Sequence, residues 1–276
     1  MSELTELSEL TELTELTAAA RGGSPRRAVG AALVILSARC MRLSRRNVDA
    51  LMTALLLPVM IMILFVELFG GAIDAGGDYV LYVVPGVLLL CVGFGAGTTA
   101  VTVCQDLTGG IVDRLRSIDV GGPALLGGHV LASTLRNAVS AALVVVVALL
   151  LGFRSSADPW HWLAAAAVLL FFVQALSWLG AVAGLLARSP EAAGGFTFFT
   201  MFLTYPSSAF APISTMPRWI QGFAQHQPVT QVIETLRGLL LGTPLGSYPV
   251  AALGWSIGIT AVSVCAAAVL FPRRTG

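Results

Sequence analysis

The sequence predicts an all-α polytopic membrane protein with six transmembrane helices, an N-terminal amphipathic interfacial helix and short re-entrant outer helices before the last span. Its 276 residues are 56% hydrophobic and only 11% charged, whereas an ordinary soluble domain carries about 25% charged residues. All sixteen basic residues are arginines, and nearly all of them lie between long apolar stretches. Six of these stretches are long enough to cross a hydrocarbon core of about 30 Å. They run roughly from Val48 to Phe69, Tyr79 to Cys104, Val130 to Gly152, Trp160 to Leu186, Ala192 to Ala211 and Tyr248 to Phe271.

Two segments precede the first span. Residues 1–25 contain a glutamate, leucine and threonine repeat of period three that buries no consistent helix face, so we expect a disordered, acidic, low-complexity tail. Residues 26–46 place apolar side chains at helical spacing and Arg39, Arg42 and Arg46 on another face. The uncharged part of this segment would form a helix only about 16 Å long. We therefore expect a connecting helix on the membrane surface, followed by a membrane domain over residues 47–276.

The arginines also predict the orientation of the chain. When loops are assigned to alternate sides, twelve arginines fall on one side, whereas the other side has Arg154, Arg218 and Arg237. By the positive-inside rule, both termini are then cytoplasmic. Arg136 is expected inside the third span, one to two turns from its cytoplasmic end, where its long side chain can reach the headgroups. A proton relay is the alternative role for such a residue.

The loop expected after the second span, Gln105 to Gly122, contains a short amphipathic helix. Ile111, Leu115 and Ile118 share one face of that helix. The charged residues on its other faces are Asp113, Arg114 and Arg116. A helix this short is unstable alone, so it suits docking into a groove of a partner protein. The alternative is a turn on the membrane surface, and the spacing does not decide between them.

Both ends of the fifth span carry local signals. Ser189 and Pro190 are a typical N-cap and first helical residue. Pro206 lacks an N–H and clashes with the preceding turn, so the helix should kink or stop there. Polar side chains cluster around this break, at Thr200, Thr204, Tyr205 and Ser207. Hydroxyl groups beside a kink can satisfy freed backbone groups or line a polar route for a substrate.

The outer segment between the fifth and sixth spans should contain a short helix that begins at Pro228 and ends at Gly242. Its apolar stripe is Val229, Val232, Ile233, Leu236 and Leu240, with Glu234 and Arg237 on the opposite face. At about 21 Å this helix cannot span a bilayer, so we expect it to be re-entrant or interfacial. It would serve as an outer gate or as a lid over helix ends.

Several kinds of chemistry are excluded or disfavoured. A chain without lysine has no P-loop lysine to reach nucleotide phosphates, so it cannot hydrolyse ATP by that route. The four cysteines and three histidines have no metal-ligand spacing, and they are interpreted as packing or surface residues. Gly254 to Gly258 matches a nucleophile elbow by letters but lies inside the last apolar span, which indicates that Ser256 is a packing residue. No cofactor is expected on this chain.

Three strings, taken together in order, resemble the permease subunits of type-2 ABC exporters, in particular the daunorubicin and doxorubicin resistance branch. They are Gln105-Asp106 followed by Gly-Gly-Ile-Val-Asp-Arg-Leu-Arg, then Ala187 to Phe196, then His226-Gln227-Pro228 leading to Ile233 to Gly238. The resemblance runs from about Asn47 to the C-terminus. It implies a homodimer or a dimer with a homologous permease in a bacterial plasma membrane, bound to two separate ATPase subunits that hold ATP and magnesium.

The resemblance also implies roles for particular residues. Residues implied in coupling to the ATPase subunit are Gln105, Asp106, Ile111, Asp113, Arg114, Leu115 and Arg116, with Arg39 and Arg42 of the connecting helix. Residues implied in the substrate path or gate are Thr200, Thr204, Tyr205, Pro206, Ser207, Glu234 and Arg237. The implied function is ATP-driven export of a drug-like or natural-product substrate. A lipid or lipid-linked glycan exporter of the same class and an ion-coupled secondary transporter are the alternatives.

Overall fold

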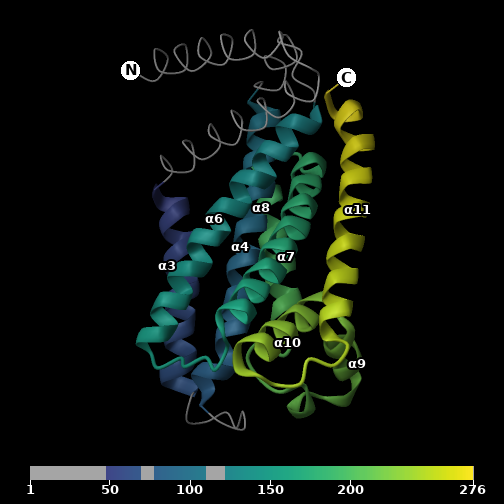
Figure 1. The fold of residues 1–276 in the computed structure, drawn as a ribbon. Helices are drawn as coiled ribbons and strands as arrows, with labels where there is room; N and C mark the ends of the chain where they lie inside the picture. Colours follow the sequence, from purple (N-terminus) through teal and green to yellow (C-terminus); the bar gives the residue numbers. More distant parts are fainter. Residues whose placement is uncertain (1–47, 70–77, 110–121, 276) are drawn as a thin grey trace.

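The computed structural model describes residues 48–69, 78–109 and 122–275, and within these ranges it contains helices and no strand. Four helices of the described part are apolar and long enough to cross a bilayer. They are α4 (Tyr79–Thr108), α6 (Gly122–Leu150), α7 (Pro159–Leu186) and α11 (Tyr248–Thr275), which run side by side along the long axis of the molecule (Figure 1). The prediction of an all-α membrane protein is therefore confirmed.

Two further helices lie where the first and fifth spans were predicted. Helix α3 (Val48–Leu64) continues into a π-helical turn, Phe65–Phe69, and together they have the bounds of the predicted first span. Helix α8 (Pro190–Thr204) has 15 residues, or a length of about 22 Å. It ends seven residues before the predicted boundary at Ala211, because the chain turns directly after it. The predicted start of α8 is confirmed, since the Ser189 side chain accepts a hydrogen bond of 3.3 Å from the Ala192 N–H.

Helix α4 forms the centre of the bundle and packs against α6, α7 and α8. Its close contact with α7 depends on two glycines of α7. A Cβ atom on Gly180 or Gly184 would collide with the backbone carbonyl of Ala96 or Ala100 of α4. These glycines let the two backbones approach closely, which is how helices associate in lipid. By contrast, nothing in the described part of the chain lies within 4 Å of a Cβ built on Gly258 of α11.

Helix α6 begins at Gly122, eight residues before the predicted start of the third span at Val130. The glycine-rich sequence at its start suggested a loop, but packing against α4 overrides this weak helix propensity. The surface of α6 is inverted relative to that of a soluble helix. Its exposed side chains are large and apolar, among them Leu131, Leu135, Val139 and Val146, whereas the polar ones are buried. This arrangement suits a helix whose outer face contacts lipid.

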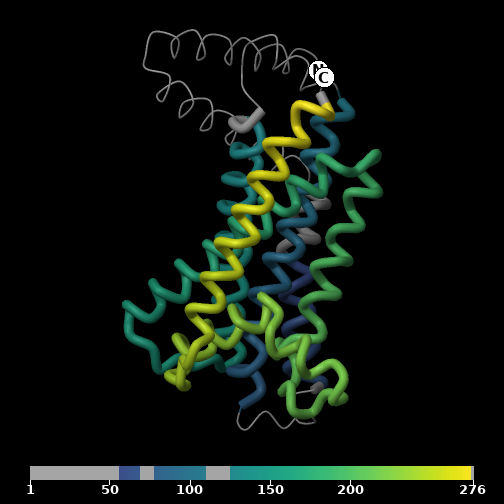
Figure 2. The backbone as a smooth tube through the Cα atoms, turned by 90° about the vertical axis from the view of Figure 1, so that its right-hand side faces the viewer, coloured from purple at the N-terminus to yellow at the C-terminus, as the bar shows by residue number. Residues whose placement is uncertain are grey.

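The outer end of the bundle is closed by short elements between α8 and α11. They are a 3₁₀ turn (Ile213–Thr215), α9 (Arg218–His226) and α10 (Pro228–Leu241), and Figure 2 shows them gathered at one end of the long helices. Gly242 ends α10 in the left-handed conformation, with φ of 73°, so both predicted ends of this helix are confirmed. Helix α10 is buried on nearly all sides by α4, α7 and α11. It is thus enclosed by protein, and Arg237, which was expected opposite the apolar stripe, is buried with it.

The glycine contacts predict that two Gly→Val substitutions, which change helix propensity equally, differ in their effect on the stability of the protein. Changing Gly184→Val should push α7 away from the Ala100 carbonyl of α4 and lower the free energy of unfolding by about 1–3 kcal/mol. Gly258→Val adds the same side chain to an open surface of α11 and serves as the control. Thermal unfolding of both purified variants in detergent measures the effect. An equal loss of stability in the two variants would contradict the packing described here.

Candidate functional site

The turn that follows α8, residues 205–211, is held by hydrogen bonds from other elements; we call it the outer turn. Three of its carbonyl oxygens accept a side-chain hydrogen bond. Pro206 accepts from Gln227 Nε2 at 2.6 Å, Ser208 from Arg237 Nη2 at 2.9 Å and Phe210 from Tyr79 Oη at 2.9 Å. Since a carbonyl left unpaired in an apolar environment costs several kcal/mol, these bonds make the break at Pro206 tolerable. The predicted stop of the helix at Pro206 is confirmed, and α8 ends at Thr204.

Arg237 of α10 joins three elements at the outer end. Its Nη1 atom lies 2.5 Å from Glu234 Oε1, and its Nη2 atom donates to the carbonyls of Tyr82 in α4 (3.0 Å) and Ser208 in the outer turn. The guanidinium carbon also lies 3.9 Å from the centre of the Tyr82 ring, a cation–π contact. Arg237 is only 7% exposed. The sequence placed it on an outer polar face, but the structure buries it inside the bundle, where its charge is satisfied by Glu234, two carbonyls and a ring.

A cavity of about 610 Å³ lies beside this contact. Its wall includes Tyr82, Glu234 and Arg237, together with Tyr248 and Trp255 of α11. The cavity therefore combines aromatic faces with an ion pair at the outer end of the molecule. The structure thus brings Glu234 and Arg237, both predicted from the sequence, together at one cavity wall.

The other residues predicted for a path or gate make contacts around the break that follows α8. The hydroxyls of Thr200, Thr204 and Ser207 donate to carbonyls of Thr197, Thr200 and Thr204, respectively, at 2.5 to 2.9 Å. Thr200 also donates to Gly93 of α4 at 3.3 Å, and the ring of Tyr205 stacks on Phe210. These groups satisfy the backbone around the break and do not line the cavity.

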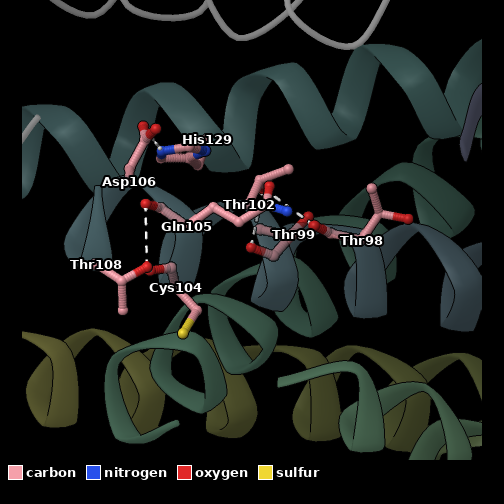
Figure 3. A network of polar contacts seen from close by, with 8 residues as sticks. All are labelled: Thr98, Thr99, Thr102, Cys104, Gln105, Asp106, Thr108 and His129. Carbon is pink, nitrogen blue, oxygen red and sulfur yellow. Dashed lines mark hydrogen bonds and ion pairs between the residues drawn. The ribbon is translucent and has the colours of Figure 1, made fainter. Parts of the chain in front are cut away.

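A second polar site lies at the opposite end of the bundle. Asp106 is in the last turn of α4 and His129 is near the start of α6, and their Oδ2 and Nε2 atoms are 3.0 Å apart (Figure 3). Both side chains are buried, whereas the neighbouring Gln105 is exposed. The sequence placed Gln105 and Asp106 in a loop, but α4 continues to Thr108 and includes both. The Thr108 hydroxyl donates to the Cys104 carbonyl at 2.9 Å within this last turn.

The other residues predicted for coupling lie outside the described part of the chain. They are Ile111, Asp113, Arg114, Leu115, Arg116, Arg39 and Arg42. His129 is a residue that the sequence reasoning missed. The signal was available in the polar spacing of His129, Ser133 and Asn137, which recur every four residues within an apolar stretch.

These residues belong to a buried polar stripe on α6, which consists of His129, Ser133, Arg136, Asn137 and Ser140. Ser133 Oγ accepts a hydrogen bond of 2.8 Å from Ser177 of α7 and lies 3.4 Å from the Gly95 carbonyl of α4. Arg136 is 14 residues from the helix start, a rise of about 21 Å, and is only 8% exposed. Arg136 therefore lies further from the start of α6 than predicted, because α6 begins earlier, and its side chain is buried within the bundle.

Comparison with known proteins adds a family relationship to this geometry. Residues 31–241 match the family described as ABC-2 type transporter. The chain is 32% identical over 195 residues to the daunorubicin resistance ABC transporter permease protein DrrB1 of Streptomyces coeruleorubidus, an alignment that covers 70% of this chain and 69% of that protein. It is also 24% identical over 235 residues to the probable doxorubicin resistance ABC transporter permease protein DrrC in two strains of Mycobacterium tuberculosis, covering 83% and 84% of the two chains.

The contacts of Arg237 predict a specific loss of stability. Arg237→Met removes the donor to the Ser208 and Tyr82 carbonyls and leaves them without that partner, at a cost of about 1–3 kcal/mol. Arg218→Met changes an exposed arginine of α9 and should have little effect. Thermal unfolding in detergent compares the two. If Arg218→Met destabilises the protein as much as Arg237→Met, the outer turn does not depend on these hydrogen bonds.

Proposed function

Because this chain belongs to the ABC-2 type transporter family, we propose that it is the permease subunit of an ATP-driven export complex, in which a separate subunit hydrolyses ATP. The substrate is a drug-like or natural-product molecule, and the biological role is antibiotic efflux. The similarity to a named daunorubicin resistance permease over more than two thirds of both chains carries this proposal. ATP hydrolysis then takes place in the partner subunit, while this chain supplies the path of the substrate through the membrane.

The proposed topology has six spans in the bacterial plasma membrane, with both termini in the cytoplasm. Helix α3 with its π-helical turn is the first span, and α8 with the outer turn is the fifth. At the inner end, Arg274 of α11 donates to the Ala187 carbonyl between α7 and α8 at 2.9 Å. The end of α11 therefore lies beside the start of α8, as the alternation of six spans requires. The arginine distribution supports the cytoplasmic assignment of that end.

The complex is proposed to contain two permeases and two ATPase subunits. The exposed face of α8 carries Phe198, Phe199 and Phe202, which are 75%, 53% and 75% exposed. Aromatic side chains at this density suit a contact between two permeases, either two copies of this chain or this chain and a homologue. Residues 110–121 are proposed to dock on the ATPase subunit, because Asp106 and His129 lie at the bundle end from which this segment leaves.

The outer turn and α10 are proposed to form the outer gate. Arg237 holds the outer turn against α4 in this structure, so opening requires the Arg237 bonds to Ser208 or Tyr82 to be exchanged. Closure of the two ATPase subunits on ATP would drive the bundle between inward-open and outward-open packings. A lipid or lipid-linked glycan could follow the same route, and this is the alternative substrate class.

An ion-coupled secondary transporter is the second candidate function, and one observation favours it. Arg136 is an ionisable residue buried near the middle of α6, where a coupling ion could be sensed. The two functions differ in the energy source that they need.

The export proposal predicts transport that depends on ATP and on the partner. Vesicles containing the permease and its ATPase subunit should export doxorubicin when ATP is added, and a protonophore should leave the rate unchanged. Vesicles without the ATPase subunit are the control and should show no uphill transport. Fluorescence of the drug measures the rate. Export that stops with the protonophore and continues without ATP would support the ion-coupled alternative.

The coupling proposal predicts the effect of changing the charged residues between α4 and α6. Replacing Asp113, Arg114 and Arg116 by alanine should lower both co-purification of the ATPase subunit and doxorubicin export, because charged contacts at the interface are lost. Replacing Arg154 and Arg218 by alanine is the matched control, since both lie at the opposite end of the bundle. Unchanged binding and export in the first variant would remove this segment from the coupling role.

A further inference from the structure

The polar stripe of α6 consists of five buried polar side chains on one helix of the bundle. Its members face α4 and α7, while the opposite face of α6 exposes large apolar side chains. An apolar stripe would serve equally well for packing in lipid, because lipid tails are as apolar as leucine. The polar side chains of the stripe therefore contribute something to the association of the helices that apolar side chains do not.

Polar contacts between helices differ from apolar ones in that they fix one register. Ser177 of α7 donates to Ser133 of α6, and Ser133 in turn lies against the Gly95 carbonyl of α4. A Cβ on Gly95 would collide with the Asn137 amide, so the two helices are in close contact at this level. Sliding α6 along α4 by even one residue would separate these groups and leave them unpaired in an apolar interior.

The Asp106–His129 pair extends this register to the inner end of the two helices. Asp106 lies two residues before the end of α4 at Thr108, and His129 lies seven residues after the start of α6 at Gly122. The pair thus bridges the two helices that flank residues 110–121, the segment proposed to contact the ATPase subunit.

We infer that the polar stripe and the Asp106–His129 pair lock α4 and α6 into a single rigid lever. Force delivered to residues 110–121 then moves both helices together rather than separating them. His129, Ser133 and Asn137 are positioning residues, which act by keeping α4 and α6 in register and do not contact the substrate. This inference rests on the proposed function, since it assumes that the segment receives force from an ATPase subunit.

A different reading of the stripe is a polar route through the bundle for a proton or a solute. A route requires the stripe to open and become hydrated during the cycle, so α4 and α6 must separate. The lever requires the opposite, because α4 and α6 must keep a constant distance. The two interpretations therefore differ in whether the distance between α4 and α6 changes during the transport cycle.

Spin-label distances test the lever directly and without any drug. Labels at Thr108→Cys in α4 and Leu131→Cys in α6 occupy exposed positions on the two helices. The four native cysteines are replaced by alanine, and labelled chains are diluted with unlabelled ones in complexes with the ATPase subunit in nanodiscs. Between the nucleotide-free and the ATP–vanadate-trapped complex, the α4–α6 distance should change by less than about 2 Å. A larger change overturns the lever.

A matched pair of variants assigns the effect to the stripe. In His129→Leu with Asn137→Leu, the α4–α6 distance distribution should broaden in the trapped complex, because the register is no longer fixed. Leu135→Ala and Val139→Ala on the exposed face of α6 form the control and should leave the distribution narrow. If the stripe variant stays as narrow as the control, these residues do not lock the helices. If the stripe variant fails to assemble, the distance between the same two labels in the protein with an intact stripe still tests whether α4 and α6 move together.

A reversible cross-link separates this inference from the proposed function. In Asp106→Cys with His129→Cys, the amount of doxorubicin exported per ATP hydrolysed should fall about tenfold, which is within the usual range of coupling between sites. Bridging the two cysteines with a short bis-methanethiosulfonate should restore the ratio, and a reductant should reverse the rescue. Wild-type export in the same vesicles tests the proposed function. If the wild type exports but bridging abolishes transport, the pair must open and the lever is wrong.

Discussion

Every backbone carbonyl inside a membrane protein needs a partner within the protein, and this constraint governs the outer end of the molecule. Pro206 ends α8 and turns the chain, so the carbonyls of the outer turn leave the helical pattern. Gln227, Arg237 and Tyr79 supply the donors from α10 and α4. The burial of α10 follows, because Arg237 reaches the Tyr82 and Ser208 carbonyls only from inside the bundle. The outer end is thus arranged around one broken helix.

The same constraint explains why the inner end has a different arrangement. Within α4, α6 and α7 the backbone is satisfied internally, so polar side chains are free to join one helix to another. Ser133 and Ser177 use that freedom between α4, α6 and α7, and Asp106 with His129 uses it at the end of the bundle. Polar side chains at the outer end therefore satisfy backbone atoms of the outer turn, whereas Ser133 with Ser177 and Asp106 with His129 join one helix to another.

Local signals in the sequence predicted the ends of several elements, because capping and proline chemistry act within a few residues. Ser189 begins α8, Pro206 stops it, and Gly242 closes α10. The sequence failed where distant packing decides the outcome. The start of α6 depends on contact with α4, and the burial of Arg237 depends on carbonyls 29 and 155 residues away. The four-residue spacing of His129, Ser133 and Asn137 is visible in the sequence, but the contact of His129 with Asp106 depends on how α4 and α6 pack.

Helix α4 connects the two ends, and its sequence decides how a movement can pass between them. Tyr82 at the outer end and Asp106 at the inner end are 24 residues apart, a rise of about 36 Å. Pro85 lies between them and lacks the N–H that would bond to the Leu81 carbonyl, so the backbone is weakest next to Tyr82. Gly86 at this point packs directly against Ala209 of the outer turn. A lever that moves α4 from the inner end would therefore bend it most where Arg237 and the outer turn are attached. The outer turn is therefore attached beside Pro85. At this position of α4, a displacement that starts near Asp106 changes the backbone geometry most.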